Sequence, residues 1–252
     1  MTIAAAIPPL SSGECQVWWA RMAAARSDLL ALLDAGERAR WLRFRRDEDR
    51  ARYLVAHALK RLVLAVHLGA AATELSFTAA CRHCGGTDHG KPRLRAAGGG
   101  IDFSLSHSGE YVVLAVTRDA AVGVDIERVN TRRDVAALIP AVLSVAEQTV
   151  VAALPATERA LAVLRYWTRK EALLKATGDG LAVAPAAITV APPDALPALI
   201  AWEAAPAFDG DAHLYDLAPG LGHVASLAVL GRRPAVSERS ADDLLAAPSS
   251  MS

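Results

Sequence analysis

The stretch IDFSLSHSGEYVVLAVTRDAAVGVDIE, residues 101–127, holds three short runs of branched and aromatic residues separated by turn-forming residues. We expect three strands here, over residues 101–106, 111–117 and 121–127. Helical periodicity lies on both sides of the stretch, over 27–68 before it and over about 133–153 and 157–177 after it. Helices and strands come in runs without strict alternation, which predicts an α+β fold and not a doubly wound parallel sheet.

The outer segments extend this layout. VWWA at 17–20 reads as an opening strand, and the segments AITV, LIAWEA, HLYDL and HVASLAVL read as later strands between Pro- and Gly-rich turns. We therefore expect an N-terminal half over residues 1–117 and a C-terminal half of similar layout over 118–234. The remainder, 235–252, is rich in Ser, Ala and Asp and reads as a mobile tail.

Bulk composition narrows the class of protein. The chain has 252 residues, of which 53% are hydrophobic, so it can bury a large core. Its formal net charge is zero, which argues against nucleic acid as a partner. No apolar run is long enough to span a bilayer and no N-terminal signal is visible, so we expect a cytoplasmic protein without a membrane partner. Three cysteines, an odd number, fit a reducing compartment.

Positive charge is concentrated in one region in spite of the neutral total. Nine Arg and Lys residues lie between Arg38 and Arg61, against the acids Asp47, Glu48 and Asp49. Such a patch on a neutral protein suggests a small anionic ligand or an acidic protein partner. The alternative is an ordinary solvated helix surface.

The predicted strand AVGVDIERV, 121–129, carries two acidic residues. Because side chains alternate along a strand, Asp125 and Glu127 share one face with Cα atoms about 6–7 Å apart. Two neighbouring carboxylates favour a cation between them, and hard oxygen ligands suit Mg²⁺ or Ca²⁺. The alternative is a strand end that runs into a polar turn.

The preceding strand ends in a Ser-His-Ser cluster. Ser106, His107 and Ser108 offer hydroxyl, imidazole and main-chain donors, which suits an anion site. Ser106 and His107 are poorly placed as nucleophile and base, because neighbours in an extended chain point apart. A polar hairpin turn is the alternative.

The segment WTRKEALLKATGDGL, 167–181, reads as a helix that ends at Gly178. Glu171 and Lys175 are four residues apart, a spacing that is common in surface ion pairs. Together with the earlier motifs, however, Glu171 supplies a third carboxylate and the lysines supply charge for phosphate oxygens. These are the groups that phosphoryl chemistry needs.

FSLSHS, GVDIERV and WTRKEALLKATGDGL, in this order, resemble the signature of the Sfp-type 4′-phosphopantetheinyl transferases. The upstream HGKPRL and the arginine-rich run over 40–64 are similar to further elements of that family. The resemblance implies a pseudo-twofold fold of two similar α/β halves with coenzyme A (CoA) in the cleft between them. It also implies a reaction of the holo-[acyl-carrier-protein] synthase type. That reaction moves the phosphopantetheine arm of CoA to a serine of an apo acyl or peptidyl carrier protein and releases adenosine 3′,5′-bisphosphate.

The resemblance also assigns roles to residues. The Mg²⁺ ligands that it implies are Asp125, Glu127 and Glu171. The catalytic residues that it implies are Glu171, which orients or deprotonates the serine, Lys175, which steadies the phosphate, and Asp125. The CoA-binding residues that it implies are Arg40, Arg52, Lys91, Ser106, His107 and Lys170. The chain resembles the long members of the family, which suggests a monomer that serves polyketide or nonribosomal peptide synthesis.

Two features depart from this pattern or stand outside it. Glu37 occupies a position where some members carry a lysine, so that contact to CoA is in doubt. The loop with Cys81, His83, Cys84 and His89 has zinc-like spacing but only one knuckle, and a polar loop with reduced thiols is the preferred interpretation. Two rival functions follow: an arginine-rich, zinc-knuckle nucleic-acid-binding module, and a non-catalytic carrier-protein-binding relative.

Overall fold

The computed structural model describes residues 7–79, 83–86, 90–95, 99–129, 135–203, 208 and 210–246, without the side chain of Leu181. Its residues group into two compact units. The first contains residues 1–78, 93–119 and 235–252, and the second contains 79–92 and 120–234. The mixed α/β content and the runs of like elements confirm the predicted α+β class. The predicted boundaries need two corrections, because 79–92 joins the second unit and 235–252 joins the first.

The first unit is built on a four-stranded sheet in the order β11-β1-β5-β4. Its strands are β1 (Glu14–Arg21), β4 (Ile101–Ser108), β5 (Tyr111–Arg118) and β11 (Ala235–Ser240). β5 runs antiparallel to both β1 and β4, whereas β11 runs parallel to β1. All but β11 were predicted, because each has a run of branched residues between turns.

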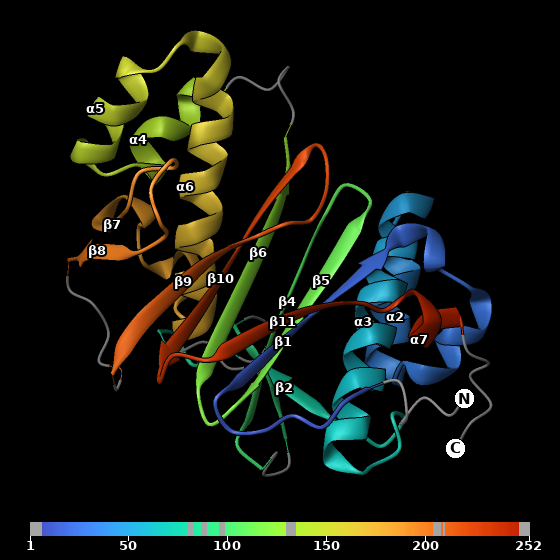
Figure 1. The fold of residues 1–252 in the computed structure, drawn as a ribbon. Helices are drawn as coiled ribbons and strands as arrows, with labels where there is room; N and C mark the ends of the chain where they lie inside the picture. Colours follow the sequence, from blue (N-terminus) through green and yellow to red (C-terminus); the bar gives the residue numbers. More distant parts are fainter. Residues whose placement is uncertain are drawn as a thin grey trace. The chain divides into compact units, whose positions relative to one another are not determined.

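Helix α3 (Asp47–Leu68) packs against β1, β4 and β5 (Figure 1). Its apolar face, with Val55, Leu59 and Val63, is buried in the core of the unit. The helix ends as predicted at Gly69, whose φ of 61° lies in the left-handed region that glycine adopts easily. Before α3 come the 3₁₀ turns η1 (Met22–Ala24) and η2 (Ser27–Leu32) and the short helix α2 (Ala35–Arg43).

The segment predicted as a mobile tail is part of the first unit. β11 pairs with β1, and the N–H of Ala241 donates to the oxygen of Trp19 at 2.7 Å. The short helix α7 (Asp242–Ala246) follows and buries Leu244 and Leu245 in the core. Burial of two leucine side chains fixes this segment, which corrects the prediction for 235–246; residues 247–252 lie outside the described part.

The second unit is built on a three-stranded antiparallel sheet in the order β6-β10-β9. Its strands are β6 (Ala121–Arg128), β9 (Asp211–Leu217) and β10 (His223–Gly231). Helix α6 (Ala156–Thr177) packs on β6 and β10, as Figure 1 shows. Pro155 precedes the helix and Gly178 caps its end in the left-handed conformation, both as predicted.

The smaller elements include one departure from prediction. The helix expected over 133–153 is interrupted, because Ser144 begins a new helix through a capping box with Glu147. The pieces in this region are η3 (Ala136–Leu138), α4 (Ile139–Val142) and α5 (Val145–Ala153). The remaining elements are β2 (Phe77–Ala79), β3 (Pro92–Leu94), η4 (Gly180–Ala182), η5 (Pro185–Ala187), β7 (Ile188–Val190) and β8 (Leu199–Trp202).

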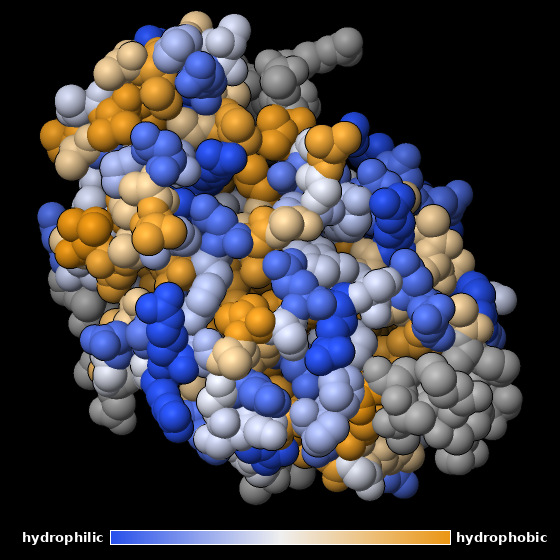
Figure 2. Space-filling model, in the orientation of Figure 1, coloured by the Kyte–Doolittle hydropathy of each residue, from blue (hydrophilic) through white to orange (hydrophobic). Residues whose placement is uncertain are grey.

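Hydrophilic and hydrophobic residues are interspersed over the face drawn in Figure 2. Within the described residues, none of the helices combines the length and the apolar character needed to cross a bilayer.

Candidate active site

Two packed elements of the second unit, β6 and α6, carry the acidic residues selected from the sequence. Asp125 and Glu127 lie on β6, and Glu171 lies on α6. A β-carbon at Gly123 would lie 1.9 Å from the carbonyl oxygen of Ala172, so this face of the strand meets the helix. Residues two apart on a strand share a face. Asp125 therefore faces α6.

Lys175 connects the helix to the strand through Asp125. Its ammonium group donates to Asp125 Oδ1 at 2.7 Å and to the main-chain oxygen of Val124 at 3.1 Å. The side chain of Asp125 is 6% exposed and that of Lys175 is 28% exposed. Water screens such a pair less than it screens a surface pair. Lys175 thus pairs across to the strand, which a reading of helix spacing alone did not predict.

Glu171 is a carboxyl group with an unusually high pKa. Burial raises the pKa of Glu171 from 4.5 to about 7; the charges of Asp125 and Glu127 add to this, and Lys175 opposes it. Its Oε1 atom is buried and accepts no hydrogen bond from the described part of the chain. The three carboxyl groups are therefore close enough to repel one another. A cation among them would relieve the repulsion and satisfy the buried oxygen.

The donor set fits a hard divalent cation. All three side chains offer carboxylate oxygens, which Mg²⁺ and Ca²⁺ prefer to nitrogen or sulfur. Among the described residues, no three or more His, Cys, Asp or Glu side chains are already gathered closely enough to enclose an ion. The ammonium group of Lys175 supplies the positive charge next to Asp125 instead. A divalent cation would have to compete with Lys175 for that carboxylate.

The structure corrects the prediction for Lys170, which was expected to contact CoA. Its side chain is fully buried, and its ammonium group donates to the carboxylate of Glu147 and, at 2.7 Å, to the oxygen of Val142. Glu147 also accepts the N–H of Val190 at 2.9 Å. An ammonium group buried this deeply needs an anionic partner. Lys170 therefore ties α6 to α5 inside the second unit.

Lys91 lies against the end of the same helix. Its ammonium group donates to the oxygen of Val122 at 2.9 Å and to the oxygen of Ala176 at 3.3 Å. The second of these carbonyls belongs to the last turn of α6, where a positive charge is favourable. Lys91 thus connects its loop to β6 and α6, at residues that lie three positions before Asp125 and five positions after Glu171.

In the first unit, Arg52 lies at the turn that follows the Ser-His-Ser cluster. Its side chain donates to the oxygen of Gly109 at 3.0 Å and to Asp49 Oδ1 at 2.8 Å. Ser106 is buried and His107 is exposed at the end of β4. The structure therefore brings the predicted anion-binding residues Arg52, Ser106 and His107 to one end of the β4–β5 hairpin.

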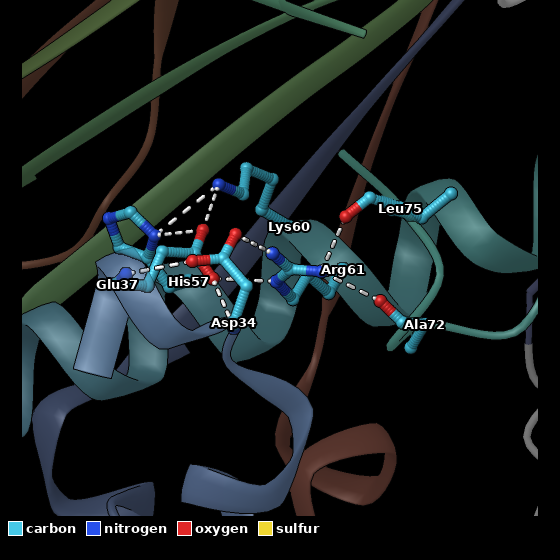
Figure 3. Close-up of polar contacts among 7 residues, drawn as sticks. All are labelled: Asp34, Glu37, His57, Lys60, Arg61, Ala72 and Leu75. Carbon is cyan, nitrogen blue, oxygen red and sulfur yellow. Dashed lines mark hydrogen bonds and ion pairs between the residues drawn. The ribbon is translucent and has the colours of Figure 1, made fainter. Parts of the chain in front are cut away.

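Glu37 is turned inward and is the centre of a charge cluster, which is shown in Figure 3. It accepts from His57 Nδ1 at 2.7 Å, Lys60 Nζ at 2.8 Å and Arg61 Nε at 2.7 Å. Burial by itself raises the pKa of Glu37, but the hydrogen bonds and charges of His57 and Lys60 outweigh it and hold the pKa well below its usual range. Burial lowers the pKa of His57 from 6.5, although the hydrogen bond and the charge of Glu37 act in the opposite direction.

This charge cluster attaches α2 to α3. α2 buries none of its residues, yet its N-cap Asp34 accepts from the fully buried Arg61 at 2.5 Å. Glu37 also completes a capping box with Asp34. Arg40, the predicted CoA contact on α2, is exposed. Glu37 is therefore turned toward the buried side of α2 and holds in place the helix that presents arginines to solvent.

The cysteine loop is described only in part. Cys81 and His89 lie outside the described residues, so the zinc hypothesis stays a prediction. Cys84 is exposed, and His83 Nε2 lies 3.1 Å from Asp179 Oδ1. Asp179, to which sequence reasoning attached no function, thus contacts this loop from the end of α6.

Sequence reasoning missed Gly123 and Glu147. The Ser144-x-x-Glu147 pattern is a capping-box signature and could have identified Glu147 as a fixed carboxylate. Gly123 had no comparable signal, because its close approach to Ala172 depends on a helix that begins more than thirty residues later.

Comparisons with known proteins agree with these motifs. Residues 17–119 match the family model "4′-phosphopantetheinyl transferase, N-terminal", and residues 121–217 match that of the 4′-phosphopantetheinyl transferase superfamily. The 4′-phosphopantetheinyl transferase HetI of Nostoc sp. is 33% identical over 209 residues, which are 81% of this chain and 81% of HetI. AcpT of Salmonella typhimurium, also a 4′-phosphopantetheinyl transferase, is 37% identical over 91 residues, or 36% of this chain and 47% of AcpT.

Among solved structures, a holo-(acyl-carrier-protein) synthase from Bacillus anthracis in complex with CoA (3′,5′-ADP) aligns with a TM-score of 0.36. It is 25% identical, and the alignment covers 44% of this chain and 94% of that one.

The chain belongs to the 4′-phosphopantetheinyl transferase superfamily. The two family models together cover both the N-terminal and the C-terminal part, and HetI matches over most of its own length. It is therefore a transferase that moves phosphopantetheine from CoA to carrier proteins. A zinc-knuckle nucleic-acid-binding module and a non-catalytic relative have no support from these matches.

Proposed function

We propose that Asp125, Glu127 and Glu171 hold Mg²⁺ against the pyrophosphate of CoA and that this site transfers phosphopantetheine to a serine of an apo acyl or peptidyl carrier protein. The supporting observation is the raised pKa of Glu171, which is about 7 because the carboxyl group is buried next to two other acids. Such a group gains the most from a bound cation. When bound, Mg²⁺ supplies charge neutralisation at the pyrophosphate oxygens.

In this proposal, Glu171 and Lys175 have different roles in the transfer step. The serine oxygen forms a bond to the β-phosphorus, the bond from that phosphorus to the bridging oxygen breaks, and adenosine 3′,5′-bisphosphate leaves. Glu171 orients the serine hydroxyl and accepts its proton. Lys175, released from Asp125, neutralises the α-phosphate as negative charge develops on the leaving group.

Binding of the nucleotide end uses the other basic and polar residues. We assign phosphate binding to Ser106 and His107, with Arg52 at the same hairpin end, and contacts to the nucleotide to Arg40 and Lys91. Arginine suits phosphate because its planar fork donates two parallel hydrogen bonds. The protein works as a cytoplasmic monomer with no nucleic-acid partner in this proposal, as in the Sfp-type members that it resembles.

Intact-mass analysis of an apo carrier protein, incubated with CoA, Mg²⁺ and this protein, tests the proposal. We expect a phosphopantetheine mass gain that disappears with EDTA. Glu171→Gln should abolish the mass gain and leave CoA binding, measured by calorimetry, within about threefold of wild type, because the amide keeps the shape and loses the charge. Glu158→Gln, at an exposed position on the same helix, is the matched control and should transfer normally. Full activity of Glu171→Gln would remove the role given to Glu171.

A further inference from the structure

Gly123 lies in the middle of β6, on the face that meets α6. A β-carbon there would lie 1.9 Å from the carbonyl oxygen of Ala172 and 2.5 Å from the nitrogen of Ala176. Both are main-chain atoms of a helix, so neither can rotate away as the end of a side chain could. The φ of Gly123 is not positive. Glycine is therefore required here for space and not for backbone conformation.

The neighbours of Gly123 are also small and buried. Ala172 and Ala176 are its contacts on the helix, and Ala228 is its cross-strand partner on β10. All three are at most 1% exposed. Small residues at a packing contact allow two backbones to approach more closely than usual. The backbones of β6 and α6 therefore approach each other closely at Gly123.

The contact is next to the acidic site on both elements. On the helix, Glu171 precedes Ala172 and Lys175 precedes Ala176; on the strand, Asp125 is two residues beyond Gly123. The bonds from Lys175 Nζ to Asp125 Oδ1 and to the oxygen of Val124, at 2.7 and 3.1 Å, cross the same strand–helix interface. The lengths of these bonds depend directly on how closely the two backbones approach.

We propose that Gly123 is a positioning residue that sets the distance between β6 and α6 and thereby holds Asp125 and Glu127 within reach of Glu171 and Lys175. This inference rests on the proposed function, in which the three acids bind Mg²⁺. Relieving a 1.9 Å contact to about 3.3 Å, a normal distance between carbon and a carbonyl oxygen, moves the strand from the helix by more than 1 Å. A displacement of that size breaks a hydrogen bond of 2.7 Å.

Cation binding, measured apart from turnover, tests the proposal. Mn²⁺ is titrated into the protein with CoA present and followed by electron paramagnetic resonance. We expect Gly123→Ala to weaken Mn²⁺ binding by about 10- to 100-fold, which is the range found when groups that orient metal ligands are lost. Gly210→Ala is the control for general damage, since both its φ of 77° and the close approach of Gly231 disfavour a β-carbon there in the same unit. It should lower thermal stability and leave Mn²⁺ affinity within about twofold of wild type.

A second substitution, which lengthens the side chain at Asp125, distinguishes a positioning role of Gly123 from a general loss of stability. Asp125→Glu alone should weaken Mn²⁺ binding, because the extra methylene does not fit the close spacing. In the Gly123→Ala background the same change should improve binding, since the longer side chain spans the widened gap. Additive losses would overturn the proposal. If Gly123→Ala does not fold, unchanged Mn²⁺ affinity of Asp125→Glu alone would also overturn it.

The outcomes distinguish this inference from the proposed function. Wild-type protein that binds no Mn²⁺ and transfers normally in EDTA would refute the metal site itself. Wild-type protein that binds Mn²⁺, together with Gly123→Ala that binds it equally well, would refute only the role of Gly123.

Discussion

The charge cluster around Glu37 makes a quantitative prediction for Glu37→Gln. The glutamine has nearly the same shape as glutamate, so the change removes charge and little packing. The carboxylate accepts hydrogen bonds from Lys60 and Arg61, which are 4% and 0% exposed at their side chains, and from His57 (Figure 3). In the variant, two buried cations share only the charge of Asp34, which pairs with Arg61.

The expected loss of unfolding free energy is large for one substitution. Removing one partner of a buried ion pair costs about 3–5 kcal/mol, because the remaining charge stays buried without compensation. Asp34 retains part of that compensation, so we expect a loss near the lower end, about 3 kcal/mol of unfolding free energy. For a chain of this size that corresponds to a fall in Tm of about 6–12 °C.

Urea and thermal unfolding, followed by circular dichroism, measure this loss. Glu110→Gln is the control, because Glu110 pairs with Arg21 at 3.6 Å with both side chains more than half exposed. Exposed pairs contribute less than about 1 kcal/mol, so this variant should resemble wild type. A Glu37→Gln variant within about 1 kcal/mol of wild type would show that the cluster does not hold α2.

Wild type and Glu37→Gln should also differ in how their unfolding free energy depends on pH. The folded pKa of Glu37 lies below the ordinary value of 4.5. The stability that its charge contributes is therefore fully present above that value and is lost as pH falls toward the folded pKa. The gap in unfolding free energy between wild type and Glu37→Gln should stay constant from about pH 7 down to 4.5 and shrink as the pH falls further to about pH 3. A gap that stays constant down to about pH 3 would contradict the assigned pKa direction.

Two further predictions concern buried groups. Lys170→Met should destabilise the protein by about 3 kcal/mol or more in urea unfolding, because Glu147 is left as an unpaired buried charge. Lys170→Met combined with Glu147→Gln should lose less than the sum of the single variants; strict additivity would contradict the pair. Burial raises the pKa of Cys15 to about 12, so iodoacetamide should alkylate the exposed Cys84 and not Cys15 in native protein. Peptide mass spectrometry checks this, and a native adduct on Cys15 would contradict its burial.

Local sequence signals predicted most of the fold. The strands at 101–108, 111–118 and 121–128 have branched residues between turns, and α3 and α6 end at glycines that adopt left-handed backbone. β11 was missed because its stability comes from pairing with β1, more than two hundred residues earlier, and only its partner carries a strong strand pattern. Leu244 and Leu245 likewise gave too short an apolar signal to stand out in a Ser- and Asp-rich segment.

In the candidate site, too, local patterns could be predicted from the sequence, whereas contacts between distant elements could not. Alternation along β6 indicates that Gly123, Asp125 and Glu127 share one face of the strand, since that depends on strand geometry alone. It could not indicate that this face meets α6, because the helix begins more than thirty residues later. The partner of Lys170 could not be read from periodicity, because Glu147 lies on a separate helix. Lys175 was expected to face phosphate, and its bond to Asp125 appears only when strand and helix are packed together.

The parallel pairing of β11 with β1 has a consequence for synthesis of the chain on the ribosome. The nascent polypeptide emerges N-terminus first. The edge of β1 that pairs with β11 therefore has no partner strand until the second unit has been synthesised. An interrupted translation product that ends before residue 235 would keep that exposed edge, which is a template for aggregation. Pairing of β11 with β1 therefore removes an exposed strand edge from the first unit.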